Sequence, residues 1–261
     1  MADTRAKNYQ DVNAEAWDRW ADAENPWTLP VSHETYERAK RGAWDVVLTP
    51  QKPVPHEWFP RMRGARVLGL ASGGGQQTPI FAALGADCTV LDNSLRQLES
   101  ERMVADREGY PLRTVRADMT KPLPFDDDTF DLIFHPVSNC YIRDVRHVWR
   151  ECFRVLRPGG VLLSGVDNGF NYLFEDDEHE PLVVKFSLPF DPVDDPEKMA
   201  FLERVDGGVQ FSHSLTEQIG GQLDAGLRLT ALYEDTCDPK QCAVARYMPE
   251  FYAMRSIKPA D

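Results

Sequence analysis

The stretch VLGLASGGG, residues 67–75, decides the fold class. A short apolar run ends in three glycines, and helix-forming residues follow at 78–84. Such a run predicts a buried strand. Glycine permits a tight turn whose main chain a ligand can approach closely. In open parallel sheets, ligands bind just beyond the carboxyl ends of the strands. The stretch therefore predicts a strand, a ligand-binding turn and a helix.

One acidic residue supports a nucleoside-type ligand at this turn. Asp92 lies about twenty residues further on, at the end of the next apolar run, where an acid can accept hydrogen bonds from ribose hydroxyls. A plain tight turn without a ligand is the structural alternative. The spacing of Gly69, Ala71 and Gly74 also fits a degenerate dinucleotide fingerprint, which keeps a nicotinamide-dependent oxidoreductase as an alternative enzyme.

Strand and helix patterns alternate on both sides of the turn. Strands are expected at 65–70, 88–91, 112–116, 130–135 and 161–164. Helices are expected at 78–84, after a capping box of Ser94 and Gln97, and from 145 to the Pro-Gly-Gly at 158–160. This order predicts an α/β domain whose mostly parallel sheet has helices on both faces.

The regions that flank this core are less regular. Residues 1–64 hold Trp17, Trp20, Trp27, Trp44 and Trp58, and we expect an N-terminal helical cap with one helix beginning after a cap at Asn13 and a second at 33–45. The domain then spans 65–261. Its acidic stretch at about 168–211 is expected to be a lid or a mobile insertion.

The C-terminal part closes the domain. Ser214 and Glu217 form a second capping box, and the following helix should bury one face made of Leu215, Ile219 and Leu223. Two final strands are expected at 227–233 and 250–257.

Composition excludes several classes of function. The net charge is −13 and no block of Lys or Arg offsets it, which opposes nucleic-acid binding. The chain has no long apolar run and its first residues lack an apolar signal core, so we expect a cytoplasmic protein that does not enter membranes. Five scattered cysteines predict neither a disulfide framework nor a metal site. A homodimer is compatible with this composition.

Residues 67–165 resemble the class I S-adenosylmethionine-dependent methyltransferases. Within them they are most similar to the small-molecule group of the ubiquinone and menaquinone biosynthesis type, which has a type 11 methyltransferase domain. In that family the first strand ends in an acid followed by Gly-x-Gly-x-Gly. Gly73 and Gly75 match the later glycines, Ala71 replaces the first, and Gly69 replaces the acid that orients the loop or contacts the methionine end.

Further segments carry the same resemblance. Asp92 matches the acid that binds ribose, and Asp118 and Met119 match the pair that flanks adenine. LPFDDDTFDLI at 123–133 and RVLRPGG at 154–160 look like the segments on either side of the fourth strand and its helix, which dehydrogenases lack at this spacing. The resemblance covers roughly 180 of 261 residues. It implies a doubly wound, seven-stranded, mostly parallel sheet with a reversed C-terminal β-hairpin.

The resemblance also implies the cofactor S-adenosylmethionine and a set of contacts to it. The expected cofactor-binding residues are Gly69, Ala71, Ser72, Gly73, Gly75, Gln76, Asp92, Asn93, Asp118, Met119, His135 and Pro136. Methyl transfer from a sulfonium requires mainly alignment of the reactants, because the donor is already activated.

The end of the fourth strand should lie beside the methyl group. A weakly acidic acceptor needs a base, and His135 is the titratable group best placed for it, with Tyr141 as a second catalytic candidate. Candidate substrate contacts are Ser138, Asn139, Trp20 and Trp27, although large aromatic residues more often serve packing. The sequence HPVS at 135–138 stands where methyltransferases acting on adenine or glutamine carry Asn-Pro-Pro-Tyr, so a different small-molecule acceptor is expected.

The expected function is methylation of a small molecule. A non-catalytic protein that binds S-adenosylmethionine or another nucleoside remains an alternative, as do the nicotinamide enzyme and a methyltransferase acting on a protein.

Overall fold

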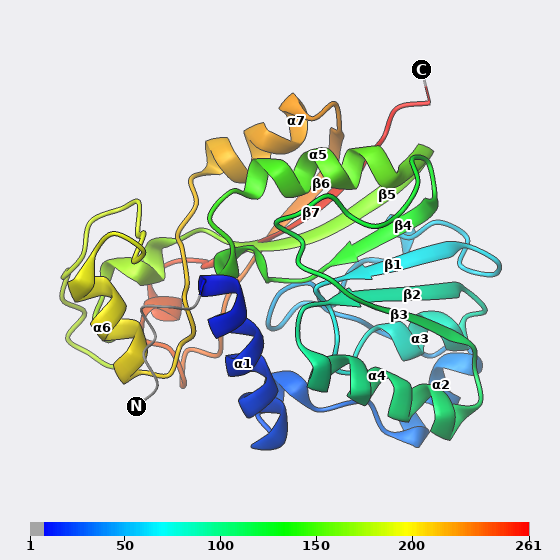
Figure 1. Ribbon diagram of the computed structural model, residues 1–261, viewed down its shortest axis with the longest axis horizontal. Coiled ribbons are helices and arrows are strands. Elements are labelled where there is room, and N and C mark those ends of the chain that lie inside the picture. Colours follow the sequence, from blue (N-terminus) through cyan, green and yellow to red (C-terminus); the bar gives the residue numbers. More distant parts are fainter. Residues whose placement is uncertain (1–7, 261) are drawn as a thin grey trace.

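In the computed structural model, which describes residues 8–260, a single seven-stranded sheet forms the centre of the molecule (Figure 1). Its strand order is β3-β2-β1-β4-β5-β7-β6. The strands are β1 (Arg66–Leu70), β2 (Asp87–Asp92), β3 (Leu112–Arg116), β4 (Phe130–His135), β5 (Leu156–Asp167), β6 (Arg228–Asp235) and β7 (Phe251–Ile257). The first five are parallel, and β7 runs antiparallel to both β5 and β6. The predicted doubly wound sheet with a reversed C-terminal hairpin is confirmed.

Helices cover both faces of the sheet (Figure 1). The helices α3 (Thr78–Ala83), α4 (Leu95–Glu108) and α2 (His33–Lys40) lie on one side, and α5 (Val145–Val155) and α7 (Gly221–Asp224) on the other. Neighbouring residues of β1 separate the two cores: Val67 packs with Phe81 of α3, whereas Leu68 packs in the cluster that includes Trp149 of α5. This alternation follows from the period of two in a strand.

The strongest predicted helix, α5, buries the expected stripe of Val145, Val148, Trp149 and Cys152. It ends at Val155, however, before the Pro-Gly-Gly at 158–160. Strand β5 begins at once, and its register against β4 shifts between Phe130 and Leu132 to accommodate these residues. At its other end β5 continues to Asp167, because residues 165–167 pair with β7. The predicted strand at 161–164 was therefore too short at both ends.

Two predictions about the helices were wrong. The first helix, α1 (Tyr9–Asp22), begins after Asn8, whose side chain accepts from the backbone N–H of Asp11. Asn13 lies inside the helix and is buried, so it is not the cap.

The second error concerns the helix after the capping box. Ser214 and Glu217 do bond each other reciprocally. The segment is a π-helical turn, η6 (Thr216–Gly220), that leads into α7, and it buries Gln218 and Gln222 while Leu215 and Leu223 are exposed. The glutamine amides find buried polar partners on other elements, so the polar face is the one that packs.

The acidic stretch after β5 is ordered around a small core of its own. It contains the short turn η5 (Phe170–Leu173) and the helix α6 (Pro196–Arg204). Tyr172, Phe186, Phe190 and Leu202 pack together there with Cys140. Within the described part of the chain, no helix is long and apolar enough to cross a membrane.

Candidate active site

A cavity of about 730 Å³ opens at the carboxyl ends of the five parallel strands. Its size falls in the range of small-molecule sites. The expected site residues that line it are Ala71, Ser72, Gly73, Gln76, Asp92, Asn93, Asp118, Met119, Pro136, Ser138, Tyr141, Trp20 and Trp27. Four expected residues do not line it: Gly69, Gly75, His135 and Asn139. The cavity spans the reversal of strand order between β1 and β4, where the fold predicts a ligand.

The glycine turn is hydrogen-bonded to the side chain of Asp92. The carboxylate of Asp92 accepts from the backbone N–H of Gly73 at 3.0 Å and from that of Ser94 at 2.9 Å. Burial raises the pKa of Asp92, and these N–H groups partly offset that effect. A side chain at Gly73 would place its Cβ 2.9 Å from the same carboxylate, so glycine is needed for this close approach. Ala71 fits the turn with a φ of +47°, in the left-handed region.

Gly69 and Gly75, the two glycines outside the cavity, have roles in the backbone of the turn. A Cβ at Gly69 would lie 2.5 Å from Oγ of Ser72 and 3.2 Å from Oγ1 of Thr78, so Gly69 makes room for the turn above it. The N–H of Gly75 donates to Oε1 of Glu101 at 2.8 Å, from the side of α4. Neither of these two expected cofactor-binding residues lines the cavity.

Polar atoms around the turn lack partners within the described residues. These buried atoms are Oγ of Ser72, Oε1 of Gln77 and both amide atoms of Gln97. Ser72, Gln77 and Gln97 line the cavity. Because buried polar groups are normally hydrogen-bonded, this set fits a ligand that brings several polar groups to the turn.

Another part of the cavity is lined by apolar side chains. Leu91, Ala117 and Ile142 line it beside Met119, which is almost fully buried. The carboxylate of Asp118 accepts from the backbone N–H of Thr120 at 2.8 Å and from its hydroxyl at 2.7 Å. These two bonds hold the carboxylate in one orientation. The geometry suits an apolar ring with a polar edge.

His135 is held below the floor of the cavity. The side chain is fully buried, and its Nδ1 lies 2.8 Å from the carbonyl oxygen of Leu70, to which the Nδ1 hydrogen is donated. Its Nε2 lies 2.8 Å from Oδ1 of Asn139, whose Nδ2 donates to Oε1 of Gln218 at 3.1 Å. Burial lowers the pKa of His135. The expectation that His135 is the base is therefore corrected: both ring nitrogens are engaged by the protein, and neither it nor Asn139 faces the cavity.

Aromatic side chains of α1 form a roof over the cavity. The ring centroids of Trp17 and Trp20 are 5.0 Å apart, and those of Trp17 and Tyr141 are 5.6 Å apart, in edge-to-face geometry. Burial raises the pKa of Tyr141 well above its usual range, so its hydroxyl keeps its proton. Trp27 lies at the rim and is 59% exposed.

Asn13 fixes this roof. Its amide donates to the carbonyl oxygens of Tyr141 at 3.1 Å and Val209 at 2.9 Å, and its Oδ1 accepts from the N–H of Val209 at 2.7 Å. The helix α1 is thereby attached to the loop after β4 and to the end of the acidic stretch.

A buried acid of the cavity was not expected from the sequence. Asp167, the last residue of β5, lines the cavity and is only 5% exposed. Its Oδ1 has no partner within the described residues. Burial raises the pKa of Asp167 from 3.8 to about 7. The signal available in the sequence was an acid directly after a buried strand, the same signal that identified Asp92, but the strand was expected to end three residues earlier.

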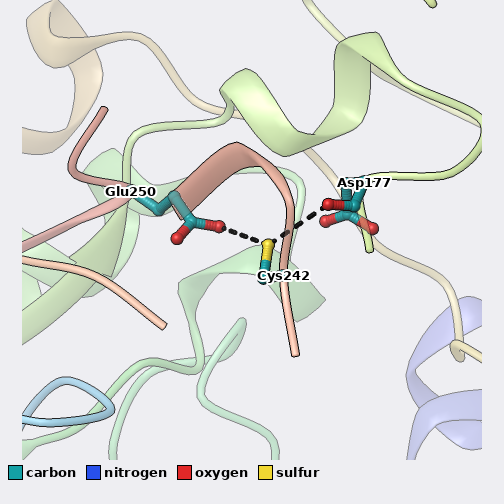
Figure 2. Close-up of side chains that lie close together, drawn as sticks. All are labelled: Asp177, Cys242 and Glu250. Carbon is teal, nitrogen blue, oxygen red and sulfur yellow. Dashed lines mark hydrogen bonds between the residues drawn. The ribbon is translucent and has the colours of Figure 1, made fainter. Parts of the chain in front are cut away.

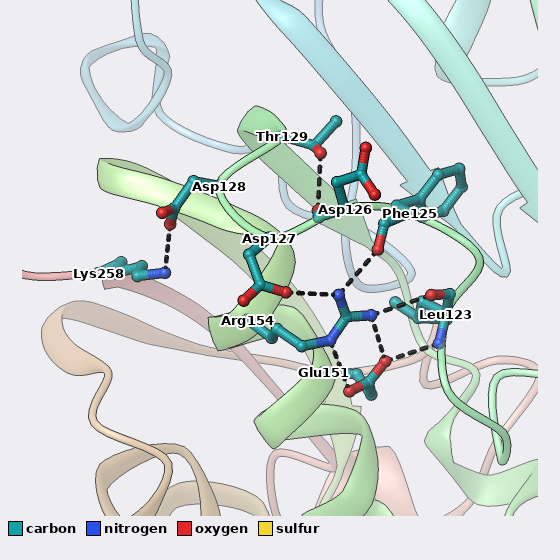
Figure 3. Close-up of polar contacts among 9 residues, drawn as sticks. All are labelled: Leu123, Phe125, Asp126, Asp127, Asp128, Thr129, Glu151, Arg154 and Lys258. Carbon is teal, nitrogen blue, oxygen red and sulfur yellow. Dashed lines mark hydrogen bonds and ion pairs between the residues drawn. The ribbon is translucent and has the colours of Figure 1, made fainter.

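The two segments that carried the strongest family resemblance lie elsewhere (Figure 3). The guanidinium of Arg154 donates to the carbonyl oxygens of Leu123 and Phe125, at 2.9 and 2.8 Å, and to the carboxylates of Glu151 and Asp127, at 2.7 and 2.9 Å. Arg154 thus joins the segment before β4 to the helix after it. These residues do not line the cavity, and their role is to hold the fold together.

A group of metal-ligand type also lies outside the cavity (Figure 2). One ligand atom from each of Asp177, Cys242 and Glu250 lies within 4.8 Å of the others. The thiol of Cys242 donates to Oε1 of Glu250 at 3.1 Å and lies 3.3 Å from the carbonyl oxygen of Asp177. Burial raises the pKa of Cys242 to about 12, so the thiol keeps its proton. As a donor it ties the segment before β7 to the acidic stretch.

Comparisons with known proteins agree with this geometry. Residues 68–164 match a family model described as a methyltransferase domain. The chain is 44% identical over 250 residues to an uncharacterised methyltransferase of Bacillus subtilis, YbaJ, with 94% of this chain and 97% of that protein covered. It is 37% identical over 102 residues to a demethylmenaquinone methyltransferase of Clavibacter sepedonicus, covering 38% of this chain and 40% of that protein.

A solved structure shows the same fold. The S-adenosylmethionine-dependent methyltransferase from Mesorhizobium loti is similar with a TM-score of 0.58 at 17% identity, over 77% of this chain and 94% of that one. The match to YbaJ over almost the whole length of both chains decides the family. The chain belongs to the class I S-adenosylmethionine-dependent methyltransferases.

Proposed function

We propose that this chain binds S-adenosylmethionine in the half of the cavity formed by β1 to β4 and methylates a small molecule held in the half beside β5. The observation that carries the proposal is the set of unpartnered buried polar atoms on Ser72, Gln77 and Gln97, three residues that line the same cavity as Asp92 and Asp118. The nucleoside and the amino-acid end of the cofactor together need polar partners at both places.

Different residues bind the different parts of the cofactor. Asp92 accepts from the ribose hydroxyls, because its two oxygens retain lone pairs beyond those used by the two backbone N–H groups. Met119 and the edge of Asp118 bind the adenine. Ser72, Gln97 and the N–H groups of the turn bind the methionine end. The bound cofactor supplies an activated methyl group, and the protein aligns the acceptor with it and excludes water.

A small molecule is the acceptor that fits the enclosure. Helix α1, the loop after β4 and the acidic stretch cover the cavity from three sides, and Asn13 bonds them together. A protein side chain would need an open channel through this roof, whereas a small molecule can enter at the rim near Trp27.

Calorimetric titration tests the cofactor. We expect S-adenosylhomocysteine to bind and NADH to give no heat. Asp92→Ala should weaken S-adenosylhomocysteine binding at least tenfold, because a charge-assisted pair of hydrogen bonds is lost. Asp87→Ala, at the exposed opposite end of the same strand, is the matched control and should leave the affinity unchanged. Binding of NADH in place of S-adenosylhomocysteine, or unchanged affinity in Asp92→Ala, would overturn the proposal.

A further inference from the structure

A buried carboxylate of the cavity, at the end of β5, has no role in binding the cofactor. Asp167 lies two strands from β1 in the sheet order, which corresponds to about 10 Å at the usual strand spacing. It is therefore displaced from the glycine turn toward the side that Tyr172 and Phe251 line. Asp167 lines the cavity, Gly169 donates its N–H to the carboxylate, and the buried Oδ1 has no partner within the described residues.

The charge of the cavity selects against anions. Its lining includes four carboxylates, those of Asp45, Asp92, Asp118 and Asp167, and no lysine, arginine or histidine among residues 8–260. Three further titratable groups face Asp167, namely Cys140, Tyr141 and Tyr172. Burial raises the pKa of each well above its usual range, so all three are neutral. Among residues 8–260, no cationic side chain lines the cavity beside Asp167.

The remaining walls of this half favour a cation over a neutral molecule. Aromatic faces attract positive charge through their quadrupole, and Trp17, Trp20 and Tyr141 form the roof. The net charge of −13 raises the local concentration of cations around the protein.

From these observations we infer that the methyl acceptor is an amine that enters as its ammonium ion, and that Asp167 binds this ion and removes its proton. The inference rests on the proposed function and names the substrate class of the same site. An ammonium ion cannot be methylated, since its nitrogen has no free electron pair.

Proton transfer to Asp167 precedes the methyl transfer. An N–H bond of the ammonium breaks and its proton goes to Oδ1 of Asp167, which leaves a neutral amine beside a neutral carboxylic acid. The nitrogen electron pair then forms the bond to the methyl carbon, while the pair of the methyl–sulfur bond goes to the sulfur. The sulfur becomes a neutral thioether and the product is an N-methylammonium ion.

The apolar surroundings favour this proton transfer. It converts an ion pair into two neutral groups, and low polarity disfavours charged forms on both sides of the pair. The same burial raises the pKa of Asp167 to about 7, close to the value that suits a general base at neutral pH.

The inference is tested by binding, without turnover. Protein saturated with S-adenosylhomocysteine is titrated with ethylamine, benzylamine and 2-phenylethylamine, and with the alcohols and carboxylic acids of the same shapes. We expect at least one amine to bind tenfold more tightly than its alcohol, and no carboxylate to bind. Asp167→Asn should weaken that amine tenfold or more, while Asp87→Asn, an exposed acid at the opposite end of the sheet, should not.

Proton release gives a second measurement. At pH 6, Asp167 holds its proton, so binding of the ammonium ion should release about one proton, read from the dependence of the binding enthalpy on the buffer; Asp167→Asn should release none. Equal binding of amine and alcohol, or amine binding that does not depend on Asp167, would overturn the inference. If the wild-type protein does not bind S-adenosylhomocysteine, it is the proposed function that fails.

Discussion

Replacing Asp167 by asparagine should make the protein more stable at neutral pH. The folded protein keeps Asp167 protonated up to about pH 7, whereas the unfolded chain releases this proton near pH 3.8. Between these values the folded state binds more protons, so the free energy of unfolding falls as the pH rises. One pKa unit corresponds to about 1.4 kcal/mol. The full effect is therefore about 4 kcal/mol, reached above pH 7, and asparagine lacks it because it does not ionise.

Urea unfolding of both proteins between pH 5 and pH 8 measures this effect. Over that interval the stability of the variant relative to the wild type should rise by about 3 kcal/mol, since the pH-dependent cost is present only in the wild type. The amide keeps the shape of the carboxyl group and replaces its O–H donor, so the comparison isolates the charge.

The stability curves of the two proteins can either diverge or stay parallel with pH, and each outcome leads to a different conclusion about Asp167. Diverging curves place a mostly protonated carboxyl in the folded cavity. Parallel curves would mean that Asp167 is ionised and stabilised in the fold, and that the reasoning from its burial is wrong. A stability cost at a site residue is a common consequence of function.

Three substitutions test the contacts that shape the site, each by urea unfolding. Asn13→Ala should lower stability by about 3 kcal/mol, because three buried hydrogen bonds are lost; a change below 1 kcal/mol would show that the roof holds without them. Gly165→Ala should cost about 1–3 kcal/mol, since its Cβ would lie 2.1 Å from the backbone oxygen of Leu48, and wild-type stability would refute that close packing. Arg154→Lys should cost about 2 kcal/mol, because lysine cannot reproduce the fork of bonds; the exposed Arg150→Lys on the same helix is its control, and equal effects would contradict the assignment.

The strands were predictable because their signals are local. β3 and β4 begin and end where their apolar patterns begin and end. The end of β5 was not predictable, because residues 165–167 are extended only through pairing with β7, which follows about ninety positions later. The same difference affected the site residues. Asp92 was identified because it follows a predicted strand, whereas Asp167 was missed because the end of its strand was not predictable.

Burial of polar side chains was the second obstacle. The spacing of Leu215, Ile219 and Leu223 indicated an apolar face, but the buried side chains are Gln218 and Gln222. Glutamine can be buried only where distant groups satisfy it, here Asn139 and Ser256. Periodicity in one segment contains no information about such partners.

His135 shows the same limit within the site. Its position at the end of β4 was correctly associated with the edge of the sheet, yet a side chain at a strand end can point to either face. In the structure it donates to Leu70 and contacts Asn139, and this network orients the loop that presents Ser138 and Tyr141 to the cavity. The residue thus contributes to the site through the loop that it holds.

The motifs that identify the family and the residues that select a substrate belong to different parts of the chain. Arg154 satisfies backbone groups at 123 and 125, so any sequence that keeps this connection between the segment before β4 and its helix must keep the motif. Asp167 and the aromatic roof on α1 satisfy no such local requirement, and they are free to differ wherever the acceptor differs. The fold could therefore be recognised from motifs, whereas the acceptor had to be inferred from charge and burial in the assembled cavity.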